Sequence, residues 1–241
     1  MGQGDALALS VGPGEAVVFD TGDDVELVDG CLERLGIREV PLLVLRHDHS
    51  DHVDGAPGVL RHRRVPAALA PAGFEDTAVG RLLAEEGVEL LAAERGQTFK
   101  VGSWTLRVLW PRPGYAGTVN DTSVVIRADG THLSALFTGD IEVPAQGELL
   151  RGPDSELLAV TVLNTPHHGS GTQDPDFLAA TRARVSVTSV GADNPYGHPA
   201  PFTRNILERI APVNASTDTD GDVAVLEDPV RVVSRGPVPG R

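Results

Sequence analysis

The sequence has very little of several residue types, and each shortage excludes a class of protein. Cys31 is its only cysteine, so neither a disulfide within the chain nor a metal cluster of thiolates can form. No stretch reaches the roughly 18 consecutive apolar residues that a membrane-spanning helix requires. The N-terminus, MGQGDALALS, has neither a basic region nor a long apolar run, so we expect no signal peptide. The composition is otherwise that of a soluble globular protein.

Positive charge and aromatic side chains are also scarce. The chain has 20 Lys and Arg residues against 34 Asp and Glu, giving a formal net charge of −14. Nonspecific nucleic-acid binders usually present a basic face, so this balance argues against that class. The one basic cluster, RHRR at 61–64, is expected to be the solvated end of a helix. A polyanionic substrate would need local neutralisation, for instance by a bound metal ion.

What is present is a regular alternation of apolar strands and amphipathic helices. The length of 241 residues suits one α/β domain, and no linker or low-complexity run divides it. Strands are expected at 5–11, 16–20, 41–45, 88–92, 98–110, 122–128, 131–137, 159–165, 184–190, 213–217, 222–226 and 231–235. Helices are expected at 24–36, 53–64, 75–87, 143–152, 174–182 and 202–210. This order predicts two sheets packed together with helices outside them.

Histidine is concentrated in loops that follow apolar strands. RHDHSDHVDG, residues 46–55, follows the strand PLLVL and contains His47, His49, Asp51 and His52. Alternate side chains of an extended segment point the same way, so His47 and His49 can bind one ion. A tight turn then directs Asp51 and His52 toward a second ion. Such ligands suit zinc, manganese or iron, and two ions roughly 3.5–4 Å apart would share a hydroxide.

Two further loops strengthen this interpretation. SALF leads to Thr138-Gly139-Asp140, and AVTVLNT leads to Pro166-His167-His168. For HxH alone, a polar surface loop or a single adventitious ion would be the better explanation. HxHxDH after a buried strand, together with these two loops, favours a metal centre held by a rigid sheet.

The motifs HDHSDH and FTGD are similar to those of the metallo-β-lactamase superfamily of dinuclear hydrolases. The chain further resembles the C-terminal domain of the ComEC family of competence proteins, which internalise DNA. That resemblance covers nearly the whole chain and rests on GQGDA (2–6), DTG (20–22), NDTSVVI (120–126), TPHHGS (165–170), SVGADNPYGHP (189–199) and TDTDGDVAV (217–225). HxHxDH alone identifies only the superfamily, whereas the HHGS, YGHP and TDxDG set is more specific.

The resemblance implies a four-layer αββα sandwich, formed by one domain over residues 1–241, and two divalent ions. It implies that His47, His49, Asp51, His52 and Asp140 are metal ligands, with Asp140 as the bridge. The superfamily's usual isolated histidine between HxHxDH and the GD loop is missing, and NDTS stands in its place. Asp121 would then supply an oxygen ligand, which would favour manganese over zinc. The alternative role for Asp121 is a turn or strand cap. His132 cannot replace the missing histidine, because it is expected in a hairpin strand.

The remaining polar residues have open roles. One of His167 and His168 would bind metal, while the other contacts the substrate or orients a ligand. His198 would protonate the leaving oxygen or hold the phosphate, and a structural loop histidine is its alternative. By resemblance, Asp20 and Asp5 would support the metal loop. Asp51 and Asp140 would hold the attacking water, with His168 or His198 assisting the leaving group.

These inferences predict a metal-dependent DNase that acts in DNA uptake and degrades the strand that is not imported. Its partners would be single-stranded DNA and the transmembrane channel domain of the same full-length protein, at the outer face of the cytoplasmic membrane. The chain itself would be a soluble piece excised from that protein. One rival is a free-standing hydrolase of a thioester, lactone or lactam, which the low aromatic content of 4% keeps open. The other is a catalytically inert DNA-guiding module.

Overall fold

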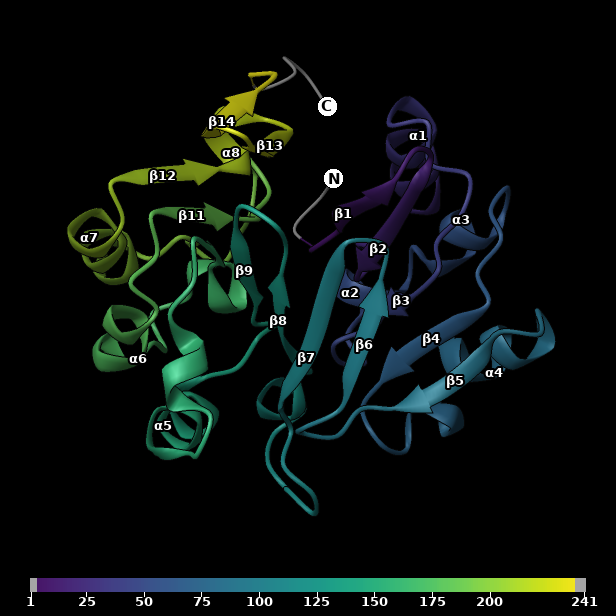
Figure 1. Cartoon of the computed structure of the whole chain (residues 1–241), viewed down its shortest axis with the longest axis horizontal. Coiled ribbons are helices and arrows are strands. Elements are labelled where there is room, and N and C mark those ends of the chain that lie inside the picture. The colour runs from purple at the N-terminus through teal and green to yellow at the C-terminus, as the bar shows by residue number, and fades with distance from the viewer. Residues whose placement is uncertain (1–3, 237–241) are drawn as a thin grey trace.

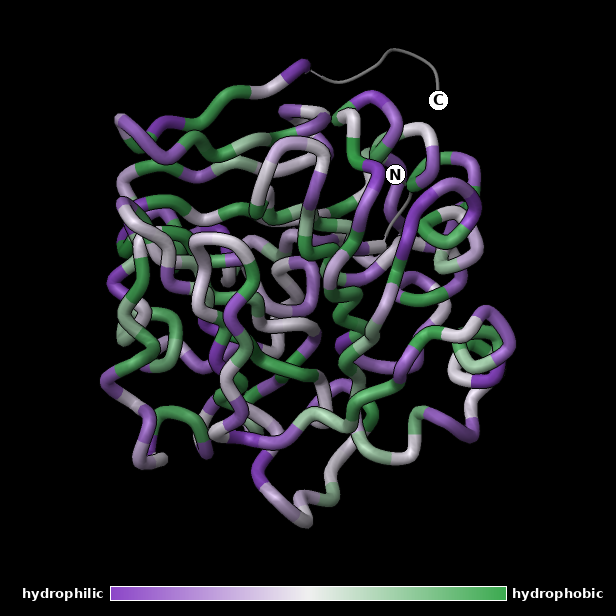
Figure 2. The backbone as a smooth tube through the Cα atoms, turned by 45° about the vertical axis from the view of Figure 1, so that its right-hand side comes forward, coloured by the Kyte–Doolittle hydropathy of each residue, from purple (hydrophilic) through white to green (hydrophobic). Residues whose placement is uncertain are grey.

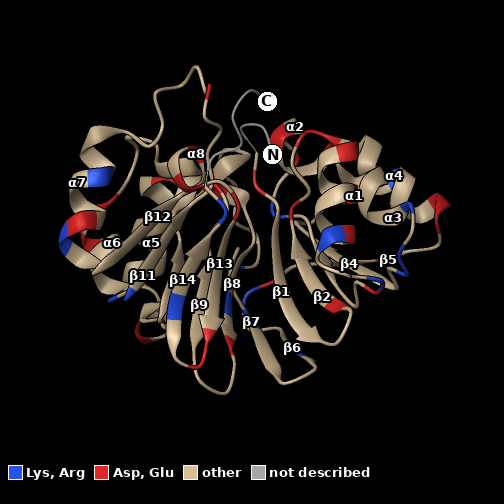
Figure 3. Ribbon diagram, turned by 90° about the horizontal axis from the view of Figure 1, so that it is seen from above, with Lys and Arg blue, Asp and Glu red and all other residues tan. Residues whose placement is uncertain are grey.

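The computed structural model describes residues 4–236 and has four layers, helix, sheet, sheet and helix (Figures 1 and 3). The predicted αββα sandwich is therefore confirmed. Gly2 and Gln3 of the GQGDA segment lie outside the described residues. No helix among residues 4–236 is long and apolar enough to cross a membrane.

The first half of the chain builds a five-stranded sheet in the order β1-β2-β3-β4-β5. Its strands are β1 (Leu7–Gly12), β2 (Glu15–Phe19), β3 (Leu43–Val44), β4 (Ala67–Ala70) and β5 (Glu89–Ala92). The β1–β2 pair is antiparallel and the other pairs are parallel. The helical elements of this half are α1 (Val25–Arg34), α2 (Ser50–Val53), α3 (Ala56–Leu60), η1 (Phe74–Asp76) and α4 (Ala78–Glu85).

The second half builds a seven-stranded sheet in the order β12-β11-β10-β9-β8-β7-β6. Its strands are β6 (Thr98–Val101), β7 (Trp104–Trp110), β8 (Val125–Asp129), β9 (Ser134–Phe137), β10 (Val162–Asn164), β11 (Val185–Thr188) and β12 (Val213–Ser216). Strands β9 to β12 run parallel. The helical elements are η2 (Asn120–Thr122), α5 (Val143–Arg151), η3 (Ser155–Leu158), η4 (Pro166–Gly169), α6 (Pro175–Ala180), α7 (Pro201–Ile210) and α8 (Thr217–Asp220), and the hairpin β13 (Val223–Glu227) and β14 (Val230–Ser234) follows.

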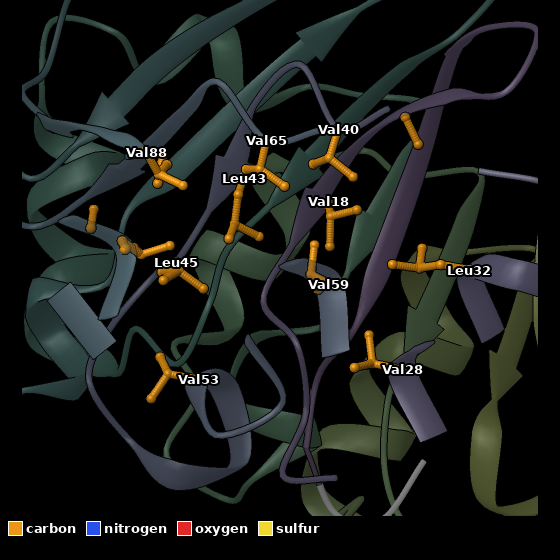
Figure 4. Packing of buried hydrophobic residues seen from close by; sticks show 14 of the residues in the cluster. Val18, Val28, Leu32, Val40, Leu43, Leu45, Val53, Val59, Val65 and Val88 are labelled. Atoms are coloured by element: carbon orange, nitrogen blue, oxygen red, sulfur yellow. The ribbon is translucent and has the colours of Figure 1, made fainter. Parts of the chain in front are cut away.

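Period-two alternation divides the apolar side chains among three cores. In β2, Val18 packs under the helices of the first half, whereas Val17 and Phe19 face the second sheet. Figure 4 shows Val18 and Leu43 within the first of these cores. Between the sheets, Phe19 stacks on Phe137 with ring centroids 3.8 Å apart. Hydrophobic segments, green in Figure 2, accordingly run through the middle of the molecule. Each such buried ring stabilises the fold by roughly 1.5–3 kcal/mol.

The prediction of one helix over 53–64 is wrong. The chain forms two short helices there, α2, which ends at Val53, and α3, which spans Ala56–Leu60. Pro57 lies in the first turn of α3. A proline has no N–H and its ring clashes with the carbonyl four residues earlier, so α2 cannot continue into α3. The chain leaves α3 at Leu60, and Arg63 turns inward instead of lying on a solvated face. Its buried guanidinium donates to the carbonyls of Ile37, Gly58 and Asp29.

The hairpin expected across Asp129-Gly130 has a longer loop than predicted. Strand β8 ends at Asp129 and β9 begins at Ser134, and the Gly130 N–H donates to the Leu133 carbonyl at 3.0 Å. His132 therefore lies in this loop and not in a strand, as had been expected. It is exposed, and its backbone N–H donates to Glu227.

Candidate metal centre

The predicted site residues come from loops at the carboxyl ends of parallel strands in both sheets. Strand β3 leads to His47, β9 leads to Asp140 and β10 leads to His167 and His168. Polar side chains are well placed there because the strands fix the loop ends while the loops themselves stay outside the core. The two sheets thus contribute to one site.

Four histidines surround the Asp140 carboxylate. His52 Nε2 lies 3.4 Å from Asp140 Oδ1. Around Oδ2 lie the Nε2 atoms of His168 at 3.6 Å, His167 at 3.7 Å and His47 at 3.9 Å. These distances exceed those of good hydrogen bonds, so the rings face the carboxylate across a gap. Asp140 is central, as expected of a bridging ligand.

Asp51 and His49 extend the cluster toward solvent. Asp51 Oδ2 lies 3.4 Å from His168 Nε2 and 3.7 Å from His52 Nε2. His49 Nδ1 lies 3.1 Å from His47 Nε2, although His49 is exposed. The pairing of His47 with His49, and of Asp51 with His52, follows the pattern inferred from their spacing.

The turn η4 brings two adjacent histidines to the same carboxylate. His167 and His168 both have left-handed backbones, with φ values of 48° and 51°, and Gly169 follows at 74°. Left-handed conformations are unfavourable for residues with a Cβ atom and tend to persist at functional sites. Their effect here is to direct both rings at Asp140. The sequence predicted that one of these histidines binds metal; in the structure the Nε2 atoms of both face the Asp140 carboxylate.

Three of the four histidine rings around Asp140 have a hydrogen-bond partner on the other nitrogen, and His167 has a carboxylate within ion-pair distance there. His52 Nδ1 hydrogen-bonds Asp20, and His168 Nδ1 lies 2.9 Å from the Ser189 carbonyl oxygen. His47 Nδ1 lies 3.2 Å from Ser123 Oγ, and this hydroxyl also accepts from the Asp140 N–H at 3.1 Å. His167 Nδ1 lies 3.1 Å from Glu142 Oε1. Such partners fix ring orientation and leave Nε2 for a metal.

Arg46 binds the buried polar residues beneath the histidine cluster, and the sequence analysis did not identify it. Its fully buried guanidinium donates to Asp20 at 2.7 Å, to Asn164 at 2.6 Å and to Asp5. Arg46 belongs to the first sheet and Asn164 ends β10, so this side chain joins the two sheets. A charged residue that continues the apolar run PLLVL was the available indication. Asp5 and Asp20 support the metal loop as expected, and they do so through Arg46 and His52.

Gly4 shows why the N-terminal motif needs a glycine. A Cβ atom there would lie 1.8 Å from the Asp51 carbonyl oxygen, and the next N–H, of Asp5, donates to that oxygen at 3.1 Å. The N-terminal segment therefore packs directly on the metal loop.

The carboxylates of the cluster favour positive charge on two of its histidines. Burial alone would lower the pKa of His52, but Asp140 and Asp20 raise it to about 10. The pKa of His168 is likewise raised, because Asp140, Asp5 and Asp51 outweigh its burial. Burial together with His52 instead lowers the pKa of His47 to about 3, which leaves its ring neutral and able to donate a lone pair. The buried Asp140 carboxyl has a pKa well below its usual range because the surrounding histidines outweigh its desolvation.

Two sets of ligand atoms fit divalent metal ions. One contains His47, His52 and Asp140, and the other contains Asp51, His52 and His168; within each set the ligand atoms lie within 4.8 Å of one another. Within residues 4–236, the buried atoms His52 Nε2, Asp140 Oδ1 and His168 Nε2 face this space without a hydrogen-bond partner. Buried polar atoms normally have partners, so this convergence fits a metal. A third set, Asp5, Asp20 and His52, already surrounds the Arg46 cation, which makes a metal ion there unfavourable.

Comparison with known proteins agrees with this geometry. Residues 2–216 match the metallo-β-lactamase superfamily. The chain belongs to that superfamily. Its fold is that of metal-dependent hydrolases, whose members bind divalent metals, often two. The metallo-β-lactamase fold protein YhfI from Bacillus subtilis has a TM-score of 0.57 and 11% identity, with 89% of this chain and 88% of that chain covered, which shows the fold alone.

The relatives of this chain include competence proteins. ComE operon protein 3 of Bacillus subtilis (strain 168) is 28% identical over 193 residues, which cover 78% of this chain and 25% of the relative. Competence protein ComA of Neisseria gonorrhoeae is 30% identical over 195 residues, covering 78% and 26% respectively. The predicted resemblance to competence proteins is confirmed. The chain spans about a quarter of the length of these relatives.

Asp121 was considered as a replacement for the missing superfamily histidine, but in the structure its side chain contacts the start of α5. Its Oδ1 accepts from the backbone N–H groups of Glu142, at 2.9 Å, and Ala145, at 3.4 Å, so it caps the start of α5. Its carbonyl accepts from the Trp110 indole at 2.6 Å. These contacts match the capping alternative. In the same NDTS segment, Ser123 is the residue that contacts the metallo-β-lactamase site, through His47 and Asp140.

His198 lies at the edge of the metallo-β-lactamase site. Its ring centroid is 5.6 Å from that of His167 and 6.5 Å from that of His168. Partial burial and the two neighbouring histidines lower its pKa. At neutral pH the ring is therefore uncharged, which suits a hydrogen-bond donor to a phosphate better than a proton donor.

Proposed function

We propose that this chain is a dinuclear metal-dependent nuclease domain that hydrolyses single-stranded DNA during DNA uptake. The observation that carries the proposal is the convergence of His47, His52, His167 and His168 on Asp140 in a chain related to competence proteins. A phosphodiester is anionic, and the surface of this protein is acidic. A cluster that concentrates positive charge at one point resolves this conflict.

The residues would divide between two ions. His47 and His49 would hold one, and Asp51, His52 and His168 the other, with Asp140 between them. His167 would complete the first set, because its Nε2 faces the same Asp140 oxygen and Glu142 orients its ring. This assignment supplies the third histidine that the sequence lacks at the usual place. Imidazoles mixed with the Asp51 and Asp140 carboxylates suit manganese or zinc, and the preference for manganese that rested on Asp121 no longer applies, because Asp121 caps α5.

The chemistry follows from these positions. When bound, two divalent cations supply the Lewis acidity that activates water and offsets phosphate charge. Asp51 is half-buried with a pKa below its usual range: desolvation raises the pKa, but the neighbouring His168 and His52 rings lower it by more. Its ionised carboxylate can hold the attacking water in line with the phosphorus. His198, neutral and at the edge, donates an N–H to a phosphate oxygen.

The proposal extends to the cellular context. The chain corresponds to about a quarter of its competence relatives. We propose that its partner is a transmembrane channel domain of the same full-length protein, and that the site lies at the outer face of the cytoplasmic membrane. There it would degrade the strand that is not imported.

A cleavage assay tests the proposal. The chain is incubated with linear single-stranded DNA and with plasmid in the presence of manganese, zinc or EDTA. We expect metal-dependent cleavage that falls at least 100-fold in His49→Ala and His168→Ala. His62→Ala is the matched control, because His62 is exposed in the turn after α3 and has no ring contact with the cluster histidines among the described residues.

Two outcomes would overturn it. Intact DNA together with hydrolysis of a thioester, lactone or lactam would assign the chain to acyl substrates. Fewer than one metal ion per chain after reconstitution, by elemental analysis, would indicate an inert module.

A further inference from the structure

Tyr196 is a prominent exposed aromatic residue, and it lies beside the metal site. The chain is only 4% aromatic, yet the Tyr196 side chain is 69% exposed. A single exposed apolar side chain is ordinary in itself. What distinguishes Tyr196 is its neighbour, because its ring stacks on His198 with centroids 5.9 Å apart and an interplanar angle of 30°.

His198 contacts both the metal-site histidines and Tyr196. The His168 and His198 rings lie 19° from parallel with centroids 6.5 Å apart, and Tyr196 stacks on the same His198 ring. A phosphate held at the cluster and touched by His198 would place the next group of its strand over Tyr196. The exposed ring is therefore one ring contact beyond His198.

The loop that carries Tyr196 is held in one conformation. Asn194 Oδ1 accepts from the His198 N–H at 3.0 Å, and its Nδ2 donates to the carbonyls of Gly191 and His198. The loop is fixed to the turn η4, because the Ala200 N–H donates to the Gly169 carbonyl at 2.7 Å. A preordered aromatic ring loses little conformational entropy when it binds a ligand.

We propose that Tyr196 is a stacking platform for the nucleobase next to the scissile phosphate. The proposal rests on the nuclease function proposed above and narrows its substrate to strands whose bases are unpaired at that position, since bases within a duplex are covered by their neighbours. Stacking is tolerant of sequence, because every base has a π face. It also adds binding energy that needs no basic surface, which suits a chain with a net charge of −14.

The test compares oligo(dT) with an oligomer of the same length whose sugars are abasic. We expect Tyr196→Ala to lower kcat/KM on oligo(dT) about tenfold or more, and to leave cleavage of the abasic oligomer unchanged. Tyr196→Trp retains a platform and should cleave oligo(dT) normally. Phe202→Ala is the matched control, since Phe202 is 50% exposed on α7 and has no ring contact with the histidine cluster among the described residues.

An equal loss on both oligomers, or no loss on either, would overturn the platform. If the wild-type chain cleaves neither oligomer with manganese, the proposed nuclease function fails instead. Fluorescence anisotropy then decides the stacking separately: tighter binding of oligo(dT) than of the abasic oligomer, lost in Tyr196→Ala, supports it, and equal binding contradicts it.

Discussion

At the scale of single residues, the site depends on which atom of each side chain faces the cluster. His167 has Nε2 near Asp140 and Nδ1 near Glu142. Thr172 Oγ1 donates to the same Glu142 oxygen at 3.1 Å, which holds the carboxylate in place. A carboxylate on the outer nitrogen fixes the ring and increases its basicity. Glu142 is therefore a positioning residue for His167.

Replacing Glu142 tests whether His167 binds metal. We expect Glu142→Gln to weaken manganese affinity roughly 10- to 100-fold, as loss of such partners usually does. Isothermal titration calorimetry of the metal-free chain measures the change. Glu148→Gln is the matched control, because Glu148 lies on the same helix but pairs with Arg112 at the surface. Equal affinities for wild type and Glu142→Gln would remove His167 from the ligand set.

At the scale of elements, the left-handed turn η4 is the feature on which the site most depends. Gly169 ends it with φ of 74°, and a Cβ atom there would lie 2.7 Å from Pro199 Cβ. The turn therefore needs glycine both for its backbone and for contact with the loop that carries His198. Packing this close cannot relax without moving one of the two loops.

A comparison with Gly87 separates the effect of the left-handed backbone from the effect of the contact with Pro199. Gly87 has the same φ of 74°, but a Cβ atom there would meet nothing within 4 Å. We expect Gly87→Ala to cost about 1–2 kcal/mol for the left-handed backbone. Gly169→Ala should cost roughly 1–3 kcal/mol more because of the contact with Pro199. Urea denaturation measures both values, and equal losses would show that the contact relaxes freely.

At the scale of the whole molecule, the site lies where loops from the two sheets meet. Asp140, His167 and His168 follow strands β9 and β10 of the second sheet, whereas Arg46 and His52 follow β3 of the first. Without metal, protons on His52 and His168 supply the charge that holds these groups around Asp140. Metal ions would take over that role, so stability should depend on both pH and metal.

Unfolding in EDTA between pH 6.5 and 10 tests this dependence. The folded-state pKa of His52, about 10, exceeds its ordinary value of 6.5. Its contribution is thus fully present below pH 6.5 and is lost as the pH rises through the folded value. We expect the free energy of unfolding to fall by a few kcal/mol over this range, and manganese to restore it. A profile in EDTA that is flat from pH 6.5 to 10 would contradict this account.

Much of the fold and part of the site could be predicted from the sequence. Apolar runs such as Ala16–Phe19 are local properties that survive folding, so most strands and helices were expected where they occur. Strand β4, Ala67–Ala70, was missed, because its short alanine-rich segment carries little strand signal. HxHxDH likewise works at short range, which is why the sequence alone predicts that His47, His49, Asp51 and His52 lie close together, as they do in the structure. The helix over 53–64 failed because Pro57 interrupts it.

Only the tertiary structure decided the roles of residues whose partners are distant in the chain. Asp121 caps α5 and Ser123 contacts His47, because folding places the first beside the start of α5 and the second beside the loop that follows β3. Arg46 finds Asn164, 118 residues away, where the two sheets meet. His167 and His168 share one carboxylate because of their left-handed backbones. A sequence pattern specifies which groups are near one another along the chain, whereas charge, burial and ligand geometry depend on groups that folding alone brings together.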